Sequence, residues 1–287
     1  RIDKEKAQQD LNNKIQQFAK NQNNRKIYIT VESETIKPEI TLESSNKFGI
    51  SEEIGVGVSD YSGSIPGRVH NVILAASKFN GIIIPKGEEF SFNKIIGDIS
   101  AASGYQQAYI ISNGRTILGD GGGVCQVSTT LFRAALNTGL PIIERHAHAY
   151  RVHYYENDQK PGLDATIYTP SVDFRFKNDT PAAILIQTEV IEEENKLIFH
   201  FYGKKDNRKI ELSDITILSQ SPALPAVMQD DPTLKKGVTK QIDWAAPGAK
   251  TTFHYKVTHK DGRVTQDRDF LSVYRPWAAV FQVGTAE

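Results

Sequence analysis

Residues 119–141, GDGGGVCQVSTTLFRAALNTGLP, hold Cys125, the single cysteine of this 287-residue chain. Three glycines come directly before it, and an apolar stripe at helical spacing follows, made of Val127, Leu131, Ala134 and Ala135. Gly139 stands where a left-handed residue ends a helix, and Pro141 blocks continuation. The stretch predicts a helix whose N-terminus lies at, or within a residue or two of, Cys125.

The start of a helix is a chemically useful place for a thiol. Unpaired backbone N–H groups and the positive end of the helix dipole favour thiolate, so we expect the pKa of Cys125 below the free value of about 8.5. The glycines allow a sharp turn and close approach of a substrate, and the N–H groups could hold an oxyanion. The alternative is an unreactive, buried apolar Cys125. The glycines and the polar residues Gln126, Ser128 and Thr129 favour a reactive Cys125 over an unreactive one.

A nucleophilic cysteine needs a base and a group that orients the base. The segment ERHAHAYRVHYY supplies His146, His148 and His153. We expect a strand here, in which His146 and His148 share a face and His153 points away. Four carboxylates are candidates for the orienting group: Asp164 and Asp173, and less favoured, Asp120 and Glu144. One of the paired histidines is therefore expected to act on Cys125, and the residues do not decide which.

Composition excludes several other classes of function. Lysine and arginine number 34, as do aspartate and glutamate, and no block of five like charges occurs, so nothing indicates nucleic acid or an anionic membrane. One cysteine rules out an internal disulfide or a cysteine cluster for metal, and the HAH pair has no marked third ligand. The glycine turn fits neither a P-loop nor a dinucleotide fingerprint. We therefore expect no metal and no cofactor.

The remaining pattern predicts an α+β fold in which strands outnumber helices. Helices are expected at 4–20 and 68–79 besides the one after the glycines. Asp261-Gly262 between two alternating runs is a strong hairpin signal. We expect three parts: a helix-plus-strand segment, 1–55; a mixed, β-rich catalytic domain whose helix carries the cysteine at its N-terminus, 56–205; and a small all-β C-terminal domain, 206–287.

From about Gly57 to Tyr202 the sequence resembles the VanW domain family. The resemblance rests on EEFSFNKIIG, on NGRTILGDGGGVCQVSTTLFRAALNTGLPIIERHAHAYRVHYY, and on GLDATI and DFRFKNDT after them. Segment 1–55 resembles the peptidoglycan-binding segment that often precedes this domain. The C-terminal region resembles the five-glycine domain of wall-binding proteins, through YKVTHKDGRV and through Gly237, Gly248, Gly262 and Gly284.

The resemblance implies a bacterial cell-envelope protein, on the outer face of the cytoplasmic membrane or in the wall. Family members usually carry an N-terminal membrane anchor. No run here approaches 18 apolar residues and no signal peptide is visible. Because the sequence begins at Arg1, we expect it to be a fragment whose anchor lies upstream. The expected partners are peptidoglycan stem peptides and glycan.

Some proteins with this domain are associated with L,D-transpeptidase activity, in which a cysteine attacks a tetrapeptide stem to form 3→3 cross-links. The resemblance implies Cys125 as nucleophile, His148 or His146 as base and Asp164 as orienting group. It places Gly122, Gly123 and Gln126 around the scissile carbonyl, with Ser128, Thr129 and Arg145 as further candidates for substrate binding.

The chain departs from better-known transpeptidases in ways that keep alternatives open. His153 stands where relatives tend to have a small residue, and an SHGC-type motif is absent. Cysteine precedes histidine here, so any shared chemistry rests on convergent geometry. The alternatives are a cysteine hydrolase of wall peptides (an endopeptidase, carboxypeptidase or amidase) and a non-catalytic wall-binding protein.

Overall fold

The computed structural model describes residues 4–20, 46–112 and 115–287. The chain divides into two compact units, Arg1–Lys47 and Phe48–Glu287. In the first, helix α1 (Lys4–Lys20) forms where the sequence predicts one. The strands predicted between 27 and 45 lie outside the described residues. Among the described helices, none combines the length and apolar character needed to cross a bilayer.

The second unit is β-rich, as expected of an α+β fold, and is built around helix α5 (Val124–Thr138). A four-stranded antiparallel sheet packs on α5, in the order β1 (Glu52–Asp60), β9 (Lys196–Gly203), β8 (Ile184–Ile191), β2 (Ile83–Ile84). Close packing depends on Gly57, because a Cβ there would lie 2.2 Å from the Thr130 carbonyl oxygen. Only glycine permits that approach of strand to helix.

Smaller elements surround this centre. Helix α3 (Pro66–Ser77) contacts α5, and β4 (Gln107–Ser112) pairs with β5 (Arg115–Asp120) just before the glycine turn. The others are β3 (Glu89–Ser91), α4 (Phe92–Ile96), β6 (Ile142–Glu144) and β7 (Arg175–Lys177), and the short 3-10 turns η1 (Asn46–Phe48), η2 (Ala101–Ser103), η3 (His153–Tyr155) and η4 (Glu192–Glu194). Strands β3, β7 and β6 form a sheet. In this sheet the rings of Phe90 and Phe176 stack, with their centres 4.5 Å apart.

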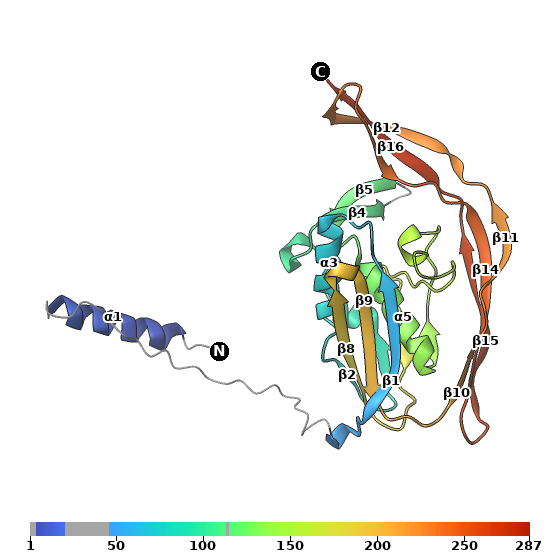
Figure 1. Cartoon of the computed structure of the whole chain (residues 1–287), viewed down its shortest axis with the longest axis horizontal. Helices are drawn as coiled ribbons and strands as arrows, with labels where there is room; N and C mark the ends of the chain where they lie inside the picture. Colours follow the sequence, from blue (N-terminus) through green and yellow to red (C-terminus); the bar gives the residue numbers. More distant parts are fainter. Residues whose placement is uncertain (1–3, 21–45, 113–114) are drawn as a thin grey trace. The chain divides into compact units, whose positions relative to one another are not determined.

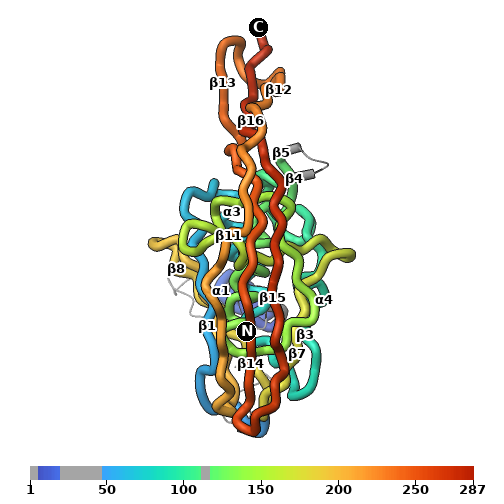
Figure 2. The backbone as a smooth tube through the Cα atoms, turned by 90° about the vertical axis from the view of Figure 1, so that its right-hand side faces the viewer, coloured from blue at the N-terminus to red at the C-terminus, as the bar shows by residue number. Residues whose placement is uncertain are grey.

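From residue 209 onward the regular elements are all strands. They are β10 (Lys209–Leu212), β11 (Thr216–Ser221), β12 (Leu224–Lys235), β13 (Thr239–Asp243), β14 (Gly248–Thr258), β15 (Val264–Tyr274) and β16 (Ala278–Ala286). Strands β14 and β15 run side by side as a long antiparallel pair, with Asp261-Gly262 in the turn between them (Figure 2). We call residues 248–274 the C-terminal ribbon.

The C-terminal ribbon packs directly on α5. Figure 1 shows α5 between the four-stranded sheet and the ribbon. Phe270 lies 5.9 Å from Phe132 of α5, and the Tyr255 hydroxyl donates to the Leu140 carbonyl at 3.1 Å. Phe253, Tyr255 and Phe270 all belong to the main hydrophobic core. The C-terminal ribbon, which lies in the predicted C-terminal domain 206–287, therefore shares a core with the cysteine-bearing helix.

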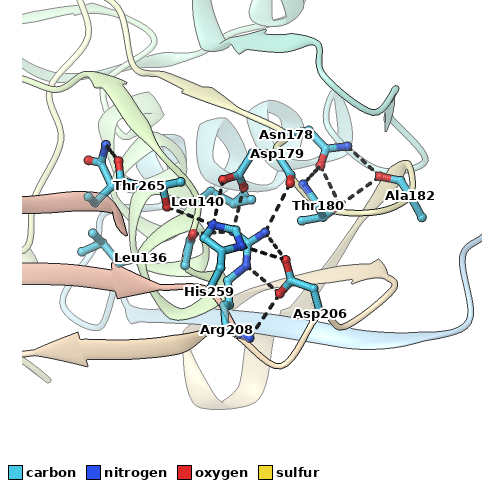
Figure 3. A network of polar contacts seen from close by, with 12 residues as sticks. Leu136, Leu140, Asn178, Asp179, Thr180, Ala182, Asp206, Arg208, His259 and Thr265 are labelled. Carbon is cyan, nitrogen blue, oxygen red and sulfur yellow. Dashed lines mark hydrogen bonds and ion pairs between the residues drawn. The ribbon is translucent and has the colours of Figure 1, made fainter. Parts of the chain in front are cut away.

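A cluster of buried charges fixes the turn end of the ribbon (Figure 3). Arg208 donates to Asp179 at 2.6 Å, to Asp206 at 2.7 Å and to the Gly139 carbonyl at 2.7 Å. His259, between β14 and β15, lies 3.5 Å from Asp179 and 3.4 Å from Asp206. Because Gly139 caps the C-terminus of α5, the cluster joins that helix to the ribbon.

Replacing Arg208 by methionine is expected to lower the free energy of unfolding by about 2 kcal/mol, because the partly buried carboxylates of Asp179 and Asp206 would lose this partner. Urea unfolding followed by circular dichroism measures the change. The neighbouring Lys209, whose side chain is 71% exposed, provides the control: Lys209→Met should stay within about 0.5 kcal/mol of the parent protein. Equal unfolding midpoints for the two variants would contradict a stabilising role for the cluster.

Candidate active site

The glycine turn delivers Cys125 to the first turn of α5. The helix begins at Val124 and its N-cap is Gly123, whose φ of 113° lies in the left-handed region. A Cβ on Gly123 would also meet Arg68 and Val72 at 3.0–3.2 Å, so glycine is required on both counts. Cys125 remains partly exposed. Cys125 thus lies at the helix start, and part of the residue's surface is exposed.

Three residues far apart in sequence meet at this point. The Cys125 thiol and the His148 ring lie close enough that each shifts the pKa of the other. The Nδ1 atom of His148 lies 2.6 Å from Asp164 Oδ2, and the His148 backbone N–H donates to the same oxygen at 2.8 Å. With Nδ1 engaged by the carboxylate, Nε2 is the ring nitrogen left for sulfur. The Cys125 sulfur also lies 3.8 Å from the Thr166 hydroxyl and 3.8 Å from the Ile167 carbonyl.

The electrostatics favour a charged site. Burial opposes ionisation of Cys125, but hydrogen bonding with His148 and the positive charge of its ring hold the pKa of the thiol below its ordinary value. Burial also opposes charge on His148, but Asp164 and Cys125 raise the pKa of the ring to about 9. Despite burial, His148 and Arg145 hold the pKa of Asp164 well below its usual range. These shifts all favour the charged forms of the trio: thiolate, imidazolium and carboxylate.

Asp164 is held by further donors on its other oxygen. Arg145 Nη2 lies 3.1 Å from Asp164 Oδ1, and the Tyr274 hydroxyl donates to Oδ1 at 2.5 Å. Arg145 also donates to the Asp164 carbonyl at 2.6 Å and to the Ser272 hydroxyl at 2.9 Å. Arg145, predicted to bind substrate, instead supports the carboxylate. Tyr274 and Ser272 come from β15, and the sequence analysis missed both.

His146 lies apart from the thiol. Its side chain is 53% exposed and pairs with Glu144 at 3.2 Å. The predicted strand ends at Glu144, and His146 forms only an isolated bridge with Thr166. The expectation that a continuous strand places His146 and His148 on one face is therefore wrong, because the backbone leaves the extended ladder between them. His148 is the histidine that the structure brings to Cys125.

Of the candidate orienting carboxylates, Asp173 and Glu144 have other partners. Asp173 accepts from the Ser91 hydroxyl at 2.5 Å and from the Asn93 backbone N–H at 2.9 Å. Glu144 accepts from the Asp173 backbone N–H at 3.1 Å. Asp164 is thus the carboxylate at the histidine. Within the described residues, no group of three histidine, cysteine or acidic side chains is placed to hold a metal ion.

Three polar side chains predicted to meet substrate lie inside the protein. Gln126, Ser128 and Thr129 have no exposed surface. Gln126 accepts from Arg68 at 2.9 Å and donates to the Ser59 hydroxyl at 2.7 Å, which joins α5 to its neighbours. Ser128 donates to the Ala165 carbonyl at 2.6 Å, and Thr129 accepts from the Ala165 N–H at 3.1 Å. These bonds fix the segment next to Asp164, so the three side chains act as scaffold.

The glycine turn directly precedes Cys125, and its backbone groups make hydrogen bonds within the protein. The Gly122 carbonyl accepts from Asn71 at 3.0 Å, which fixes the turn on α3. The N–H groups of Val124 and Gln126 donate to the carbonyls of Gly121 and Gly123, at 3.1 and 2.9 Å. Those two amides are therefore already engaged and are poor candidates for holding an oxyanion.

Comparison with known proteins identifies the segment that carries the trio. Residues 67–202 match the family model described as VanW like protein. Over 139 residues, 48% of this chain, the sequence is 37% identical to the uncharacterized protein YoaR of Bacillus subtilis (strain 168), covering 45% of that protein. Over 139 residues, again 48% of this chain, it is 34% identical to the vancomycin B-type resistance protein VanW of Enterococcus faecalis (strain ATCC 700802 / V583), covering 50% of it. The matched region thus spans about half of each relative. Tyr274 lies outside the family match.

Proposed function

Residues 67–202 form a VanW-like domain, and on this premise we propose that the chain is a cysteine acyltransferase of the bacterial cell wall. More narrowly, it acts as an L,D-transpeptidase that joins peptidoglycan stem peptides through 3→3 cross-links, on the outer side of the cytoplasmic membrane. The observation that carries the proposal is the alignment of Cys125, His148 and Asp164 at the start of α5. A cysteine at a helix start, beside a histidine that a carboxylate orients, is the arrangement that acyl transfer requires.

The first half-reaction forms a thioester. The Cys125 thiolate attacks the carbonyl carbon of the bond between the L-centre and the terminal D-Ala of a tetrapeptide stem. The negative charge that develops on oxygen is held by the Cys125 backbone N–H in the first helical turn. The C–N bond then breaks, and His148 gives its Nε2 proton to the departing amine of D-Ala. Asp164 holds the ring in the orientation that this transfer needs.

The second half-reaction releases the acyl group. An amine from a neighbouring stem attacks the thioester, neutral His148 takes the proton from that amine, and Cys125 leaves as thiolate. Water in place of the amine would give hydrolysis and a shortened stem. Cys125 and His148 would play the same roles with either acceptor, so the choice between transfer and hydrolysis depends on which acceptor reaches the thioester.

The proposal is tested by incubating the purified protein with defined tetrapeptide muropeptides and measuring product masses. We expect release of D-Ala together with 3→3 cross-linked dimers. Tripeptide stems without dimers would replace the transferase with a hydrolase. Unchanged muropeptides would instead favour a wall-binding protein without catalytic activity and would overturn the proposal.

A further inference from the structure

We propose that Tyr274, on the C-terminal ribbon, is a positioning residue for the Cys125–His148–Asp164 trio, so that the active site extends beyond the VanW-like domain. The effect of Tyr274 on catalysis rests on the proposed function. The contacts of Tyr274 with the trio do not depend on that function. Residues 206–287 would then serve catalysis directly, in addition to any wall-binding role suggested by the five-glycine resemblance.

The hydroxyl of Tyr274 completes the ring of donors around a buried carboxylate. Asp164 is 3% exposed and Tyr274 is 5% exposed. Both His148 donors use Oδ2, while Oδ1 accepts from Arg145 at 3.1 Å and from Tyr274 at 2.5 Å. A distance of 2.5 Å is typical of a strong hydrogen bond from hydroxyl to carboxylate. Tyr274 therefore makes the shorter of the two bonds that fix Oδ1, and with it the plane of the carboxylate that His148 faces.

Tyr274 remains a donor throughout the working range of the site. Burial and the adjacent charge of Asp164 raise the pKa of the Tyr274 hydroxyl far above its ordinary value. The phenol therefore keeps its proton whenever His148 is positively charged. Its bond to Asp164 lowers the energy of the carboxylate form, which is the form that holds the imidazolium.

The residues directly after the C-terminal ribbon contact the segment that carries His148. The Arg275 backbone N–H donates to the Ala149 carbonyl at 2.7 Å. Directly beyond, Trp277 stacks on Tyr150, with ring centres 4.3 Å apart and planes 15° from parallel. The residues directly after β15 thus hold the two residues that follow His148 in sequence. Two members of the trio depend on contacts with this part of the chain.

A second tyrosine on the ribbon provides a matched control. Tyr255, on β14, is also fully buried, and its hydroxyl donates to the Leu140 carbonyl at 3.1 Å. It lies at the other end of α5 from Cys125. Tyr255→Phe and Tyr274→Phe each remove one buried hydroxyl and its donated hydrogen bonding from the same ribbon, but only the second touches the trio.

Tyr274→Phe is expected to lower the turnover number about 10-fold with KM unchanged, because Tyr274 holds a supporting group and does not touch substrate. Two readouts do not depend on muropeptides. The rate of Cys125 alkylation by iodoacetamide at neutral pH should fall, and the downfield proton resonance of His148 Nδ1 should shift or broaden. Tyr255→Phe should leave both readouts at parental values.

The outcomes separate this proposal from the proposed function. If the parent protein does not act on muropeptides, the proposed function fails, while alkylation and the His148 resonance still decide the role of Tyr274. Parental alkylation and an unchanged resonance in Tyr274→Phe would overturn the proposal. If that variant fails to fold, Ser272→Ala decides instead, since it removes the acceptor of Arg145 at 2.9 Å. Smaller shifts in the same readouts support the proposal, and parental values reject it.

Discussion

Replacing Cys125 by alanine is expected to abolish transfer between muropeptides, with a loss of about 10⁴-fold or more. The reason is that the sulfur forms the acyl bond, and removal of a nucleophile leaves only binding and oxyanion stabilisation. Alanine is the best helix former, and Cys125 is only partly buried, so the fold should be retained. Product masses after incubation with tetrapeptide muropeptides, together with the thermal midpoint, measure both effects.

Serine at position 125 sharpens this test. Cys125→Ser keeps a similar shape, but a hydroxyl is far less acidic than a thiol, so His148 would not hold it as an anion. We expect the serine variant to be nearly as inactive as the alanine variant. Cross-linking at the parental rate by either folded variant would show that the reaction does not pass through the sulfur.

The second large effect is expected from His148→Ala, which removes the proton donor and the positive partner of the thiolate. The turnover number should fall by about 10³-fold or more. His146→Ala offers a matched control from the same segment, because the His146 side chain is 53% exposed and pairs with Glu144 at 3.2 Å. That variant should remain within about threefold of the parent. Both are measured as initial rates of D-Ala release.

A reversed order for the two histidines would contradict the assignment of roles. If His146→Ala lost activity while His148→Ala kept it, the base would be His146, and the bond between His148 and Asp164 would be structural. Such a result would require the loop after β6 to rearrange in solution, since the structure brings His148 and not His146 to Cys125.

The local part of the site could be predicted from the sequence because it depends on neighbouring residues. The glycines, the apolar stripe after Val124 and the stop at Gly139 specify a helix and its limits, and α5 runs from Val124 to Thr138. The choice between two histidines could not be predicted in the same way. It depends on where β6 ends: its ladder with β7 shifts register between Ile142 and Glu144 and goes no further than Glu144, which sequence alternation alone does not reveal.

The supporting contacts were beyond prediction because they join distant parts of the chain. Tyr274 and Asp164 are 110 residues apart. Alternation in β15 shows that Phe270, Ser272 and Tyr274 share a face, but not what that face meets. The buried Gln126 shows the opposite difficulty: a polar side chain next to a nucleophile suggests contact with substrate, unless one knows that Ser59 and Arg68 pack against it.

The central claim is that Cys125 rests as a thiolate beside a protonated His148, and the pH dependence of Cys125 alkylation tests it most directly. The chain has one cysteine, so the label reports on a single site. As pH rises, Cys125 should lose its proton first, because the pKa of the thiol is lowered, and His148 should follow only near its pKa of about 9. We predict a substantial rate that is flat from near-neutral pH to the onset of His148 deprotonation, and loss of that plateau in His148→Ala. A single rise centred near the free-thiol value of about 8.5, the same with and without His148, would contradict the account.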